Sequence, residues 1–447
     1  MDTPIVDFVK AYAQSGKARF HMPGHKGVSF FGCEELDITE ISGADELYVP
    51  EGIILESEKN AATLFGTSCT VYSAGGSTQS IQAMLFAAYC RADKRGGKPF
   101  VIAGRNAHKA FIYAAAKLDF DIVWLYPEQS SGICSCIVTA EMLESQLSIC
   151  GEKPFAVYIT SPDYLGGVTD IAALSAVCRA HGVPLLVDNA HGAYLAFCDK
   201  SIHPINLGAD MCCDSAHKTL PVFTGGGYLH VSKDDFFGFA DGVVGSMAVF
   251  GSTSPSYLIM QSLDMCNRYM SERIRADIKD CAERVERVRK VMRRNGIEDV
   301  SCEPLKITAD FRNFTADGFD NTGDYFRSLG IEPEYCDGDF TVFMASPFNS
   351  EDDFLRLEAA FDNICLTKRV CKEFTIERSE QVMSVREAVF APSEVISASR
   401  ALGRICAAPS VSCPPAIPIA VSGEIITENH ISAFEHYGIN QIVVVKN

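Results

Sequence analysis

The sequence has no run of roughly 18 or more apolar residues, and its N-terminus has no basic region followed by an apolar stretch and a cleavage site. The first absence argues against a helix that spans a membrane, and the second argues against secretion. We therefore expect a cytoplasmic protein with no membrane partner.

A basic patch is lacking as well. Lys and Arg number 39 against 57 Asp and Glu, the net charge is −18, and no Lys/Arg-rich run occurs. Because binding to phosphate backbones needs a positive field, this balance argues against a nucleic-acid partner. An acidic balance suits a cationic substrate, but solubility explains it equally well, so the charge decides nothing alone.

Zinc-ligand spacing is absent from the 18 cysteines. They are scattered through apolar segments. Cys134 and Cys136 form a CxC pair and Cys212 and Cys213 are adjacent, but neither pair has a second Cys/His pair at the required spacing. We interpret the cysteines as reduced core residues and expect no metal site.

From about Glu58 onward, short apolar runs alternate with helical segments. Helical patterns such as Ser77–Tyr89, Ala107–Lys117 and Ile171–His181 separate several of the runs. This alternation predicts βαβ units, and hence an α/β fold with a mostly parallel sheet and ligands at the carboxyl ends of its strands. The runs, each bounded by Gly, Pro or Asn, are Cys69–Ala74, Phe100–Ala103, Asp121–Tyr126, Phe155–Thr160, Val183–Val187, Ala209–Cys213 and Gly227–Val231.

The pattern changes after Gly251, where a long helical stretch begins near Ser254 and runs toward Arg294. Beyond about Val300 the sequence predicts short strands and helices at Leu305–Phe311, Asn321–Leu329, Phe340–Ala345 and Glu351–Phe361. We therefore predict an N-terminal segment of residues 1–50, a large domain of residues 51–295 and a small C-terminal α+β domain of residues 296–447, with the long helical stretch as a bridge.

The segment Ser-Ala-His-Lys-Thr at residues 215–219 carries the sharpest chemical signal. It follows the apolar run that ends at Cys213, so Lys218 is predicted at a strand end beside hydroxyls and glycines. Taken alone, such a lysine is usually a solvated surface residue. Asp188 ends a buried-looking strand 30 residues earlier, where an α/β site places polar groups. That carboxylate suits a protonated pyridine nitrogen, although it is also a common cap of the next turn.

A further strand end, at residues 73–78, carries two glycines and two hydroxyls that open a helix. Gly76 permits close approach of the backbone, and the helix N-terminus presents free N–H groups. Ser77 and Thr78 add donors for a phosphate. Alone, this pattern is equally typical of a plain helix cap.

His108 follows the predicted strand Phe100–Ala103. At this position an imidazole suits stacking on a planar ring or proton exchange near neutrality. A histidine that caps a helix or packs in the core fits the sequence equally well, so both interpretations stay open.

Together these motifs resemble the ornithine/lysine/arginine decarboxylase family, in the short form that has no extra N-terminal regulatory domain. The resemblance covers nearly the whole chain. The matching segments are His21–Gly27, Asp37–Glu40, Gly43–Leu47, Ser77–Gln79, Arg105–Lys109, Ser161–Gly166, Asp188–Gly192, Ser215–Pro221, Ala401–Ile405 and Pro414–Pro418.

The resemblance implies a fold-type-I pyridoxal-phosphate enzyme. In it, Lys218 is the Schiff-base lysine, Asp188 is the partner of the pyridine nitrogen, and His108 stacks on the cofactor and is a candidate proton donor. His191 lies beside the cofactor. Because two subunits build each site in this superfamily, a homodimer is implied as well. The implied phosphate-binding set is Gly76, Ser77, Thr78, Ser215 and His217.

The same resemblance implies decarboxylation of an amino acid, with a basic one (ornithine, lysine or arginine) expected, as in polyamine biosynthesis. Glu424 is our candidate for the acid that meets the substrate's distal cation, because an isolated buried ammonium is costly. Asp45 and Glu46 compete with it. All three acids also fit surface or capping roles. Asn189 and Ser422 depart from the family's Glu and Pro, which leaves the amino acid open.

An aminotransferase or C–S lyase of the same fold is the alternative reaction. It would share Lys218 and Asp188 but hold the substrate carboxylate with an arginine, for which Arg386, Arg400 and Arg404 are candidates. Arg404 matches the decarboxylase pattern, which favours decarboxylation. A catalytically silent relative that binds the cofactor is the other alternative, and the complete set of lysine, aspartate and phosphate donors disfavours it.

Overall fold

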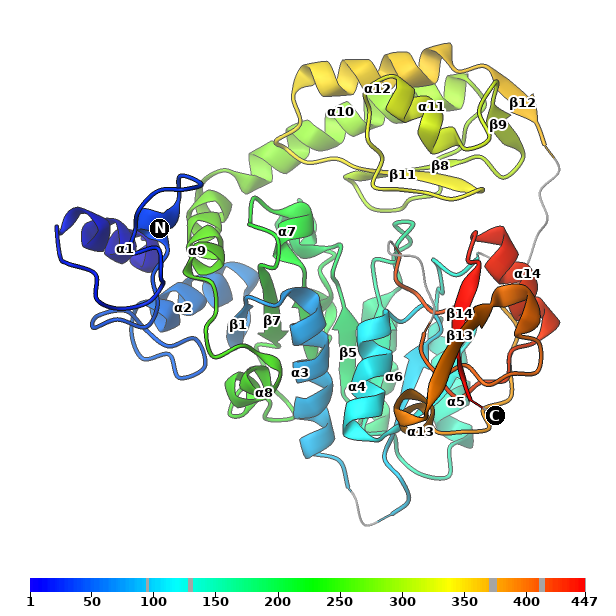
Figure 1. The fold of residues 1–447 in the computed structure, drawn as a ribbon, viewed down its shortest axis with the longest axis horizontal. Coiled ribbons are helices and arrows are strands. Elements are labelled where there is room, and N and C mark those ends of the chain that lie inside the picture. The colour runs from blue at the N-terminus through cyan, green and yellow to red at the C-terminus, as the bar shows by residue number, and fades with distance from the viewer. Residues whose placement is uncertain (94–95, 128–131, 370–375, 410–414, 447) are drawn as a thin grey trace. The chain divides into compact units, whose positions relative to one another are not determined.

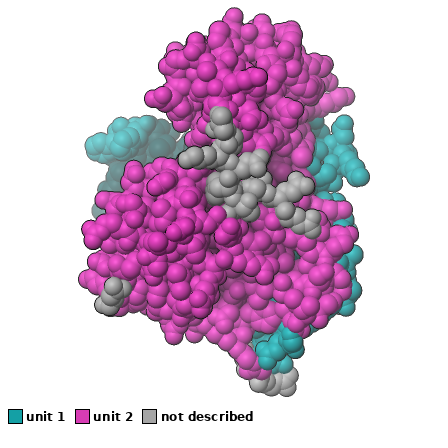
Figure 2. All heavy atoms as spheres, turned by 90° about the vertical axis from the view of Figure 1, so that its right-hand side faces the viewer, with its two compact units in different colours: residues 1–95, 151–161, 171–276 teal, residues 96–150, 162–170, 277–447 magenta. Residues whose placement is uncertain are grey.

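The computed structural model describes residues 1–93, 96–127, 132–369, 376–409 and 415–446, so Pro414 of the last matching segment lies outside the described residues. The chain divides into two compact units, coloured separately in Figure 2. Unit 1 comprises residues 1–95, 151–161 and 171–276, and unit 2 comprises residues 96–150, 162–170 and 277–447. The three contiguous domains that we drew from the sequence stay a prediction.

A seven-stranded sheet has the order β1-β7-β6-β5-β4-β2-β3 (Figure 1). The pairs β2–β3, β4–β5 and β5–β6 are parallel, whereas β7 runs antiparallel to both β6 and β1. All seven predicted strands are confirmed to within two residues, as is the mostly parallel α/β fold. The strands are β1 (Cys69–Ser73), β2 (Phe100–Gly104), β3 (Asp121–Leu125), β4 (Ala156–Thr160), β5 (Leu185–Asp188), β6 (Met211–Asp214) and β7 (Gly227–Val231).

In unit 1, helix α3 (Gly76–Cys90) packs against β5, β6 and β7 (Figure 1). Its residues are buried without a break from Gln79 to Leu85, as expected for a helix covered on several sides. The other helices of this unit are α1 (Pro4–Gln14), α2 (Ile53–Phe65), α6 (Ile171–His181), α7 (Ala216–Thr219), α8 (Val243–Phe250) and α9 (Tyr257–Glu272), with 3₁₀ turns at Glu34–Leu36, Ala193–Phe197 and Pro204–Leu207.

The single helical stretch predicted from Ser254 to Arg294 is wrong in one respect. It consists of two helices, α9 and α10 (Ile274–Arg294), which are separated at Arg273. The backbone of Arg273 leaves the helical region, with φ −135° and ψ −28°. Neither Gly nor Pro occurs at this break, so no helix-breaking residue in the sequence signals it.

Unit 2 contains the predicted α+β pattern. Strands β10 (Tyr335–Cys336), β11 (Phe340–Met344) and β8 (Lys306–Asp310) form one antiparallel sheet. Strand β9 (Phe314–Ala316) pairs with β12 (Leu366–Lys368), and β13 (Ser393–Ser397) pairs with β14 (Gln441–Val445). The helices that lie wholly in this unit are α4 (Lys109–Leu118), α5 (Ala140–Ile149), α11 (Thr322–Ser328), α12 (Glu351–Asn363), α13 (Val385–Phe390) and α14 (Glu428–His436), with a 3₁₀ turn at Ala398–Arg400.

A buried apolar cluster that includes Tyr164, Val342, Ile419, Phe434 and Val444 packs loops of unit 2 against its strands. Among the described residues, no helix combines the length and the apolar character that crossing a membrane would require.

Candidate active site

Lys218 and His191 lie together in unit 1. Helix α7 follows β6 almost directly and carries Lys218, whose Nζ lies 3.0 Å from His191 Nε2. His191 is buried, whereas the lysine side chain is exposed. The structure therefore brings these two predicted residues into contact.

Asp188 ends β5 and is 2% exposed. The Tyr158 hydroxyl donates to its Oδ2 at 3.0 Å, and the Ala190 N–H donates to its Oδ1 at 3.2 Å. Burial raises the pKa of Asp188, and the charge of Lys218 acts in the opposite direction. A buried carboxylate in this state favours a further cationic partner, which a protonated pyridine nitrogen would supply. The bond from Ala190 also matches the capping alternative.

Three strand termini meet where the phosphate was predicted. Ser73 at the end of β1 pairs with Gly227 at the start of β7, and Asp214 at the end of β6 pairs with Tyr228. Packing is close here, because a Cβ added to Gly227 would lie 2.7 Å from the Asp214 carbonyl oxygen. Gly76, at φ +66°, adopts a conformation that favours glycine.

Two residues of the predicted phosphate-binding set, Gly76 and His217, contact the glycines that precede β7. The N–H of Gly76 donates to the Gly225 carbonyl at 2.7 Å, and His217 Nδ1 donates to the Gly226 carbonyl at 2.9 Å. Helix α3 begins without a side-chain cap; Ser77 is half-buried and Thr78 is exposed.

The hydroxyl of Ser215 is buried and has no hydrogen-bond partner among the described residues. Because a buried hydroxyl without a partner is costly, it points to a ligand that would satisfy it. With Lys218, Asp188 and the uncapped helix start, this donor set fits pyridoxal phosphate.

His108 belongs to unit 2, where it is the N-cap of α4. Its Nδ1 accepts a hydrogen bond from the Ala110 N–H at 3.1 Å. The capping alternative that we left open is therefore confirmed. Stacking on the cofactor stays a prediction.

Asp45 is buried and accepts hydrogen bonds from the backbone N–H groups of Glu46, Glu51, Gly52 and Ile54, at 2.8 to 3.0 Å. Burial opposes ionisation, but these donors outweigh it and lower the pKa of Asp45. Such contacts are those of a residue that caps α2. The neighbouring Glu46 is exposed, and its carboxylate makes no hydrogen bond or ion pair with another described residue.

Glu424 is 2% exposed and lies 3.6 Å from the Arg105 guanidinium, which is itself buried. Burial raises the pKa of Glu424, while the charge of Arg105 opposes that shift. Arg105 also donates to the carbonyls of Pro418 and Ile419 at 2.8 and 2.7 Å. This pairing matches a structural role for Glu424, and its role toward a substrate stays a prediction. Sequence reasoning missed Arg105 as its partner, although both residues lie in family-like motifs.

Two of the three candidate carboxylate clamps, Arg386 and Arg404, are engaged elsewhere, whereas Arg400 is exposed. Arg386 donates to the carbonyls of Ala116 and Lys117, at 3.0 and 3.1 Å. Arg404 donates to Glu394 and to the Val445 carbonyl, both at 2.8 Å. These contacts weigh against their use as the substrate clamp of an aminotransferase.

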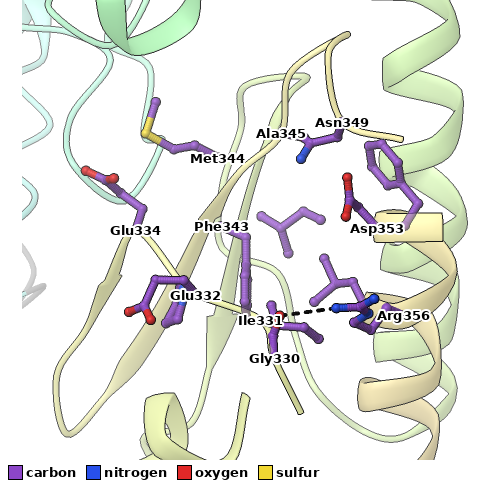
Figure 3. A pocket seen from close by; sticks show the side chains of 14 residues that line it. Gly330, Ile331, Glu332, Glu334, Phe343, Met344, Ala345, Asn349, Asp353 and Arg356 are labelled. Atoms are coloured by element: carbon purple, nitrogen blue, oxygen red, sulfur yellow. Dashed lines mark hydrogen bonds between the residues drawn. The ribbon is translucent and has the colours of Figure 1, made fainter. Parts of the chain in front are cut away.

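A cavity of about 370 Å³ in unit 2 contains none of the predicted site residues (Figure 3). Figure 3 shows Arg356 bonded to the Gly330 carbonyl, with Glu332, Glu334 and Asp353 among the lining side chains. The position of this cavity therefore does not identify the candidate active site.

Comparisons with known proteins give a family match over most of the chain. Residues 3–322 match the family described as Orn/Lys/Arg decarboxylase, major domain. A Bacillus subtilis protein named arginine decarboxylase is 29% identical, over 96% of this chain and 92% of its own length. One of the same name from Halalkalibacterium halodurans is 27% identical, with the same coverage of both chains.

Solved structures show the same fold. A lysine decarboxylase from Francisella novicida superposes with a TM-score of 0.80 at 14% identity, over 99% of this chain and 79% of the other. The constitutive lysine decarboxylase of E. coli superposes with a TM-score of 0.76 at 16% identity, over 100% of this chain and 82% of the other.

We predict that Lys218→Ala removes the visible absorbance of the bound cofactor and all turnover while the protein stays folded, because no other amine replaces Nζ. Absorbance and turnover are measured beside a thermal melt. Lys200→Ala, at another exposed lysine of unit 1, is the matched control and leaves all three unchanged. A Lys218→Ala protein that keeps its absorbance would falsify the assignment.

We predict that Asp188→Asn retains cofactor but lowers kcat about a hundredfold or more, because a neutral amide no longer favours a protonated ring nitrogen. Tyr158→Phe, which removes one hydrogen bond to the same carboxylate, lowers kcat by about tenfold at most. Cofactor content and kcat are measured on the same samples. Unchanged turnover in the Asn variant with cofactor bound rules out this role.

Proposed function

The chain belongs to the Orn/Lys/Arg decarboxylase family of pyridoxal-phosphate-dependent lyases, and we propose that it decarboxylates a basic amino acid (arginine, lysine or ornithine) to the amine and carbon dioxide. The observation that carries the proposal is the contact of Lys218 with His191 in the same strand-end region as buried Asp188 and the unsatisfied Ser215 hydroxyl.

Pyridoxal phosphate, when bound, would supply the electron sink that decarboxylation needs. The protein's residues would bind the cofactor and move protons. Lys218 would hold the cofactor through Nζ, and Asp188 would keep the ring nitrogen protonated. His191 Nε2, at 3.0 Å from Nζ, is placed to accept or return a proton there. Ser215, His217 and the start of α3 would hold the phosphate, and His108 is our candidate for stacking on the ring.

Of the three candidate acids, Glu46 supports a substrate role best. Asp45 is saturated by backbone donors, and Glu424 is paired with Arg105. Glu46 has an exposed carboxylate that is not engaged by other described residues. An unengaged carboxylate is what a substrate ammonium or guanidinium needs when it leaves water.

We infer that the protein is a homodimer in which Glu46 reaches the partner's site. The N-terminal segment exposes Phe20 (96%), Met22 (64%), Phe30 (78%) and Phe31 (95%), an amount of apolar surface that favours coverage by another chain. We also infer a cytoplasmic location, since sixteen described cysteines are free thiols, as is usual in a reducing compartment.

The function is tested by incubating the purified protein and pyridoxal phosphate with arginine, lysine, ornithine and, for contrast, leucine and aspartate. We expect carbon dioxide and the matching amine from at least one basic amino acid, with Lys218→Ala as the blank. In a parallel assay with a 2-oxo acid as amino acceptor, formation of the substrate's keto acid in place of carbon dioxide would establish the aminotransferase alternative. No product from any basic amino acid would overturn the proposal.

We predict that Glu46→Gln raises KM for the basic substrate about tenfold or more with little change in kcat, because a charged partner is lost from binding. Glu424→Gln instead lowers the melting temperature, because it removes the charge that compensates Arg105.

Mixing of variant subunits tests whether Glu46 acts across the dimer interface. Heterodimers of Lys218→Ala and Glu46→Gln subunits contain one site with both native residues only if Glu46 acts across the interface. Recovery of the wild-type KM on mixing is the expected result. If KM stays high, or if Glu46→Gln raises KM equally for apolar substrates, the assignment fails.

A further inference from the structure

Asp214 is the centre of a buried hydrogen-bond cluster next to the candidate site. It is the last residue of β6 and directly precedes Ser215. Its Oδ2 accepts from His203 Nε2 at 3.0 Å and from His230 Nε2 at 3.1 Å, and its Oδ1 accepts from Asn189 Nδ2 at 2.7 Å. All four side chains are 0% exposed.

The two imidazoles of this cluster have a partner at every ring nitrogen. His203 Nδ1 accepts a hydrogen bond from the Ile205 N–H at 3.3 Å. His230 Nδ1 accepts one from the Thr70 hydroxyl at 2.8 Å. Both rings therefore donate through Nε2 to the same carboxylate oxygen. His203, Asp214 and His230 are residue types that bind metals, but here they form a complete hydrogen-bonded set.

The cluster keeps Asp214 ionised. Burial alone would raise the pKa of Asp214, but His203 and His230 outweigh it and hold that pKa well below its usual range. Burial lowers the pKa of His230, which favours its neutral form. Burial also raises the pKa values of the facing Cys212, Cys213 and Tyr228, so these groups stay neutral near pH 7.

Asn189 connects the cluster to the neighbouring strand. It follows Asp188 at the end of β5, and its backbone N–H donates to the Cys213 carbonyl at 3.0 Å. Its side-chain amide makes the bond to Asp214, so one backbone bond and one side-chain bond join the ends of β5 and β6. A carboxylate at position 189 would face Asp214 at this distance and repel it, so the amide is required here.

We propose that Asn189 and Asp214 are positioning residues that clamp the Asp188 end of β5 to the Ser215–Lys218 end of β6, and that the fixed negative charge of Asp214 favours the protonated form of the lysine-bound cofactor. This inference rests on the proposed function for its cofactor. It adds residues that do not themselves touch the reacting atoms.

Two single variants and their combination test the clamp. Asn189→Asp sets two carboxylates together, weakens cofactor binding about tenfold or more, and raises the pH midpoint of the cofactor's visible absorbance change because negative charge is added. Asp214→Asn removes a negative charge and lowers that midpoint. In the double variant the amide and the carboxylate exchange places, so binding and midpoint both return toward wild type.

Asp264→Asn is the matched control. Asp264 is also a 0% exposed carboxylate in unit 1, and it accepts from the N–H groups of Ile5 and Val6. Its variant lowers the melting temperature without moving the midpoint. Where Asp214→Asn fails to fold, Asn189→Ala removes the side-chain bond without adding charge, and it weakens cofactor binding with the midpoint close to wild type.

None of these readouts needs a substrate. If the wild type binds the cofactor but decarboxylates no basic amino acid, the proposed function fails while the clamp is still tested. Midpoints that move in the same direction in both single variants, or a double variant no better than Asn189→Asp, would overturn the clamp. Unchanged cofactor binding in Asn189→Ala would overturn it as well.

Discussion

The negative charge of Asp188, buried at the end of β5, is the constraint on which the site depends. A carboxylate that is 2% exposed is costly unless it is compensated, and one tyrosine hydroxyl, one backbone N–H and the Cys213 thiol compensate it only in part. Its raised pKa reflects this deficit. Cations are therefore favoured beside it, first the Lys218 amine and then a protonated ring nitrogen. The burial of this single side chain therefore supports the cofactor role that we propose for Asp188.

A second buried carboxylate, Asp214, ends the neighbouring strand β6, and its environment shifts its pKa in the opposite direction. Two imidazoles and one amide donate to it, and its pKa falls where that of Asp188 rises. Two acids in adjacent strands thus have different roles because their donors differ. Such a separation of pKa values by environment is typical of sites that move protons.

The strands and the central residues could be predicted from sequence because they depend on local order. Strands buried on both faces read as apolar runs, and residues that directly follow such runs lie at one edge of the sheet. Lys218 and Asp188 were predicted this way, whereas His191 was predicted from the family resemblance. Tyr158, His203 and Arg105 were missed as partners because their contacts join segments with no fixed spacing. The break at Arg273 was missed because neither Gly nor Pro marks it.

The reversed strand β7 affects how the chain can fold during synthesis. Strand β1 pairs with β7 alone, and Cys69 faces Val231, so this edge of the sheet closes only after more than half of the chain has been made. Pairings between such distant segments are slow to form, because the loop between them must be ordered first. The glycines before β7 then complete the junction with β1 and β6. A nascent chain that has not yet reached β7 lacks this junction, so the strand ends at which we propose phosphate binding meet only after Val231 has been made.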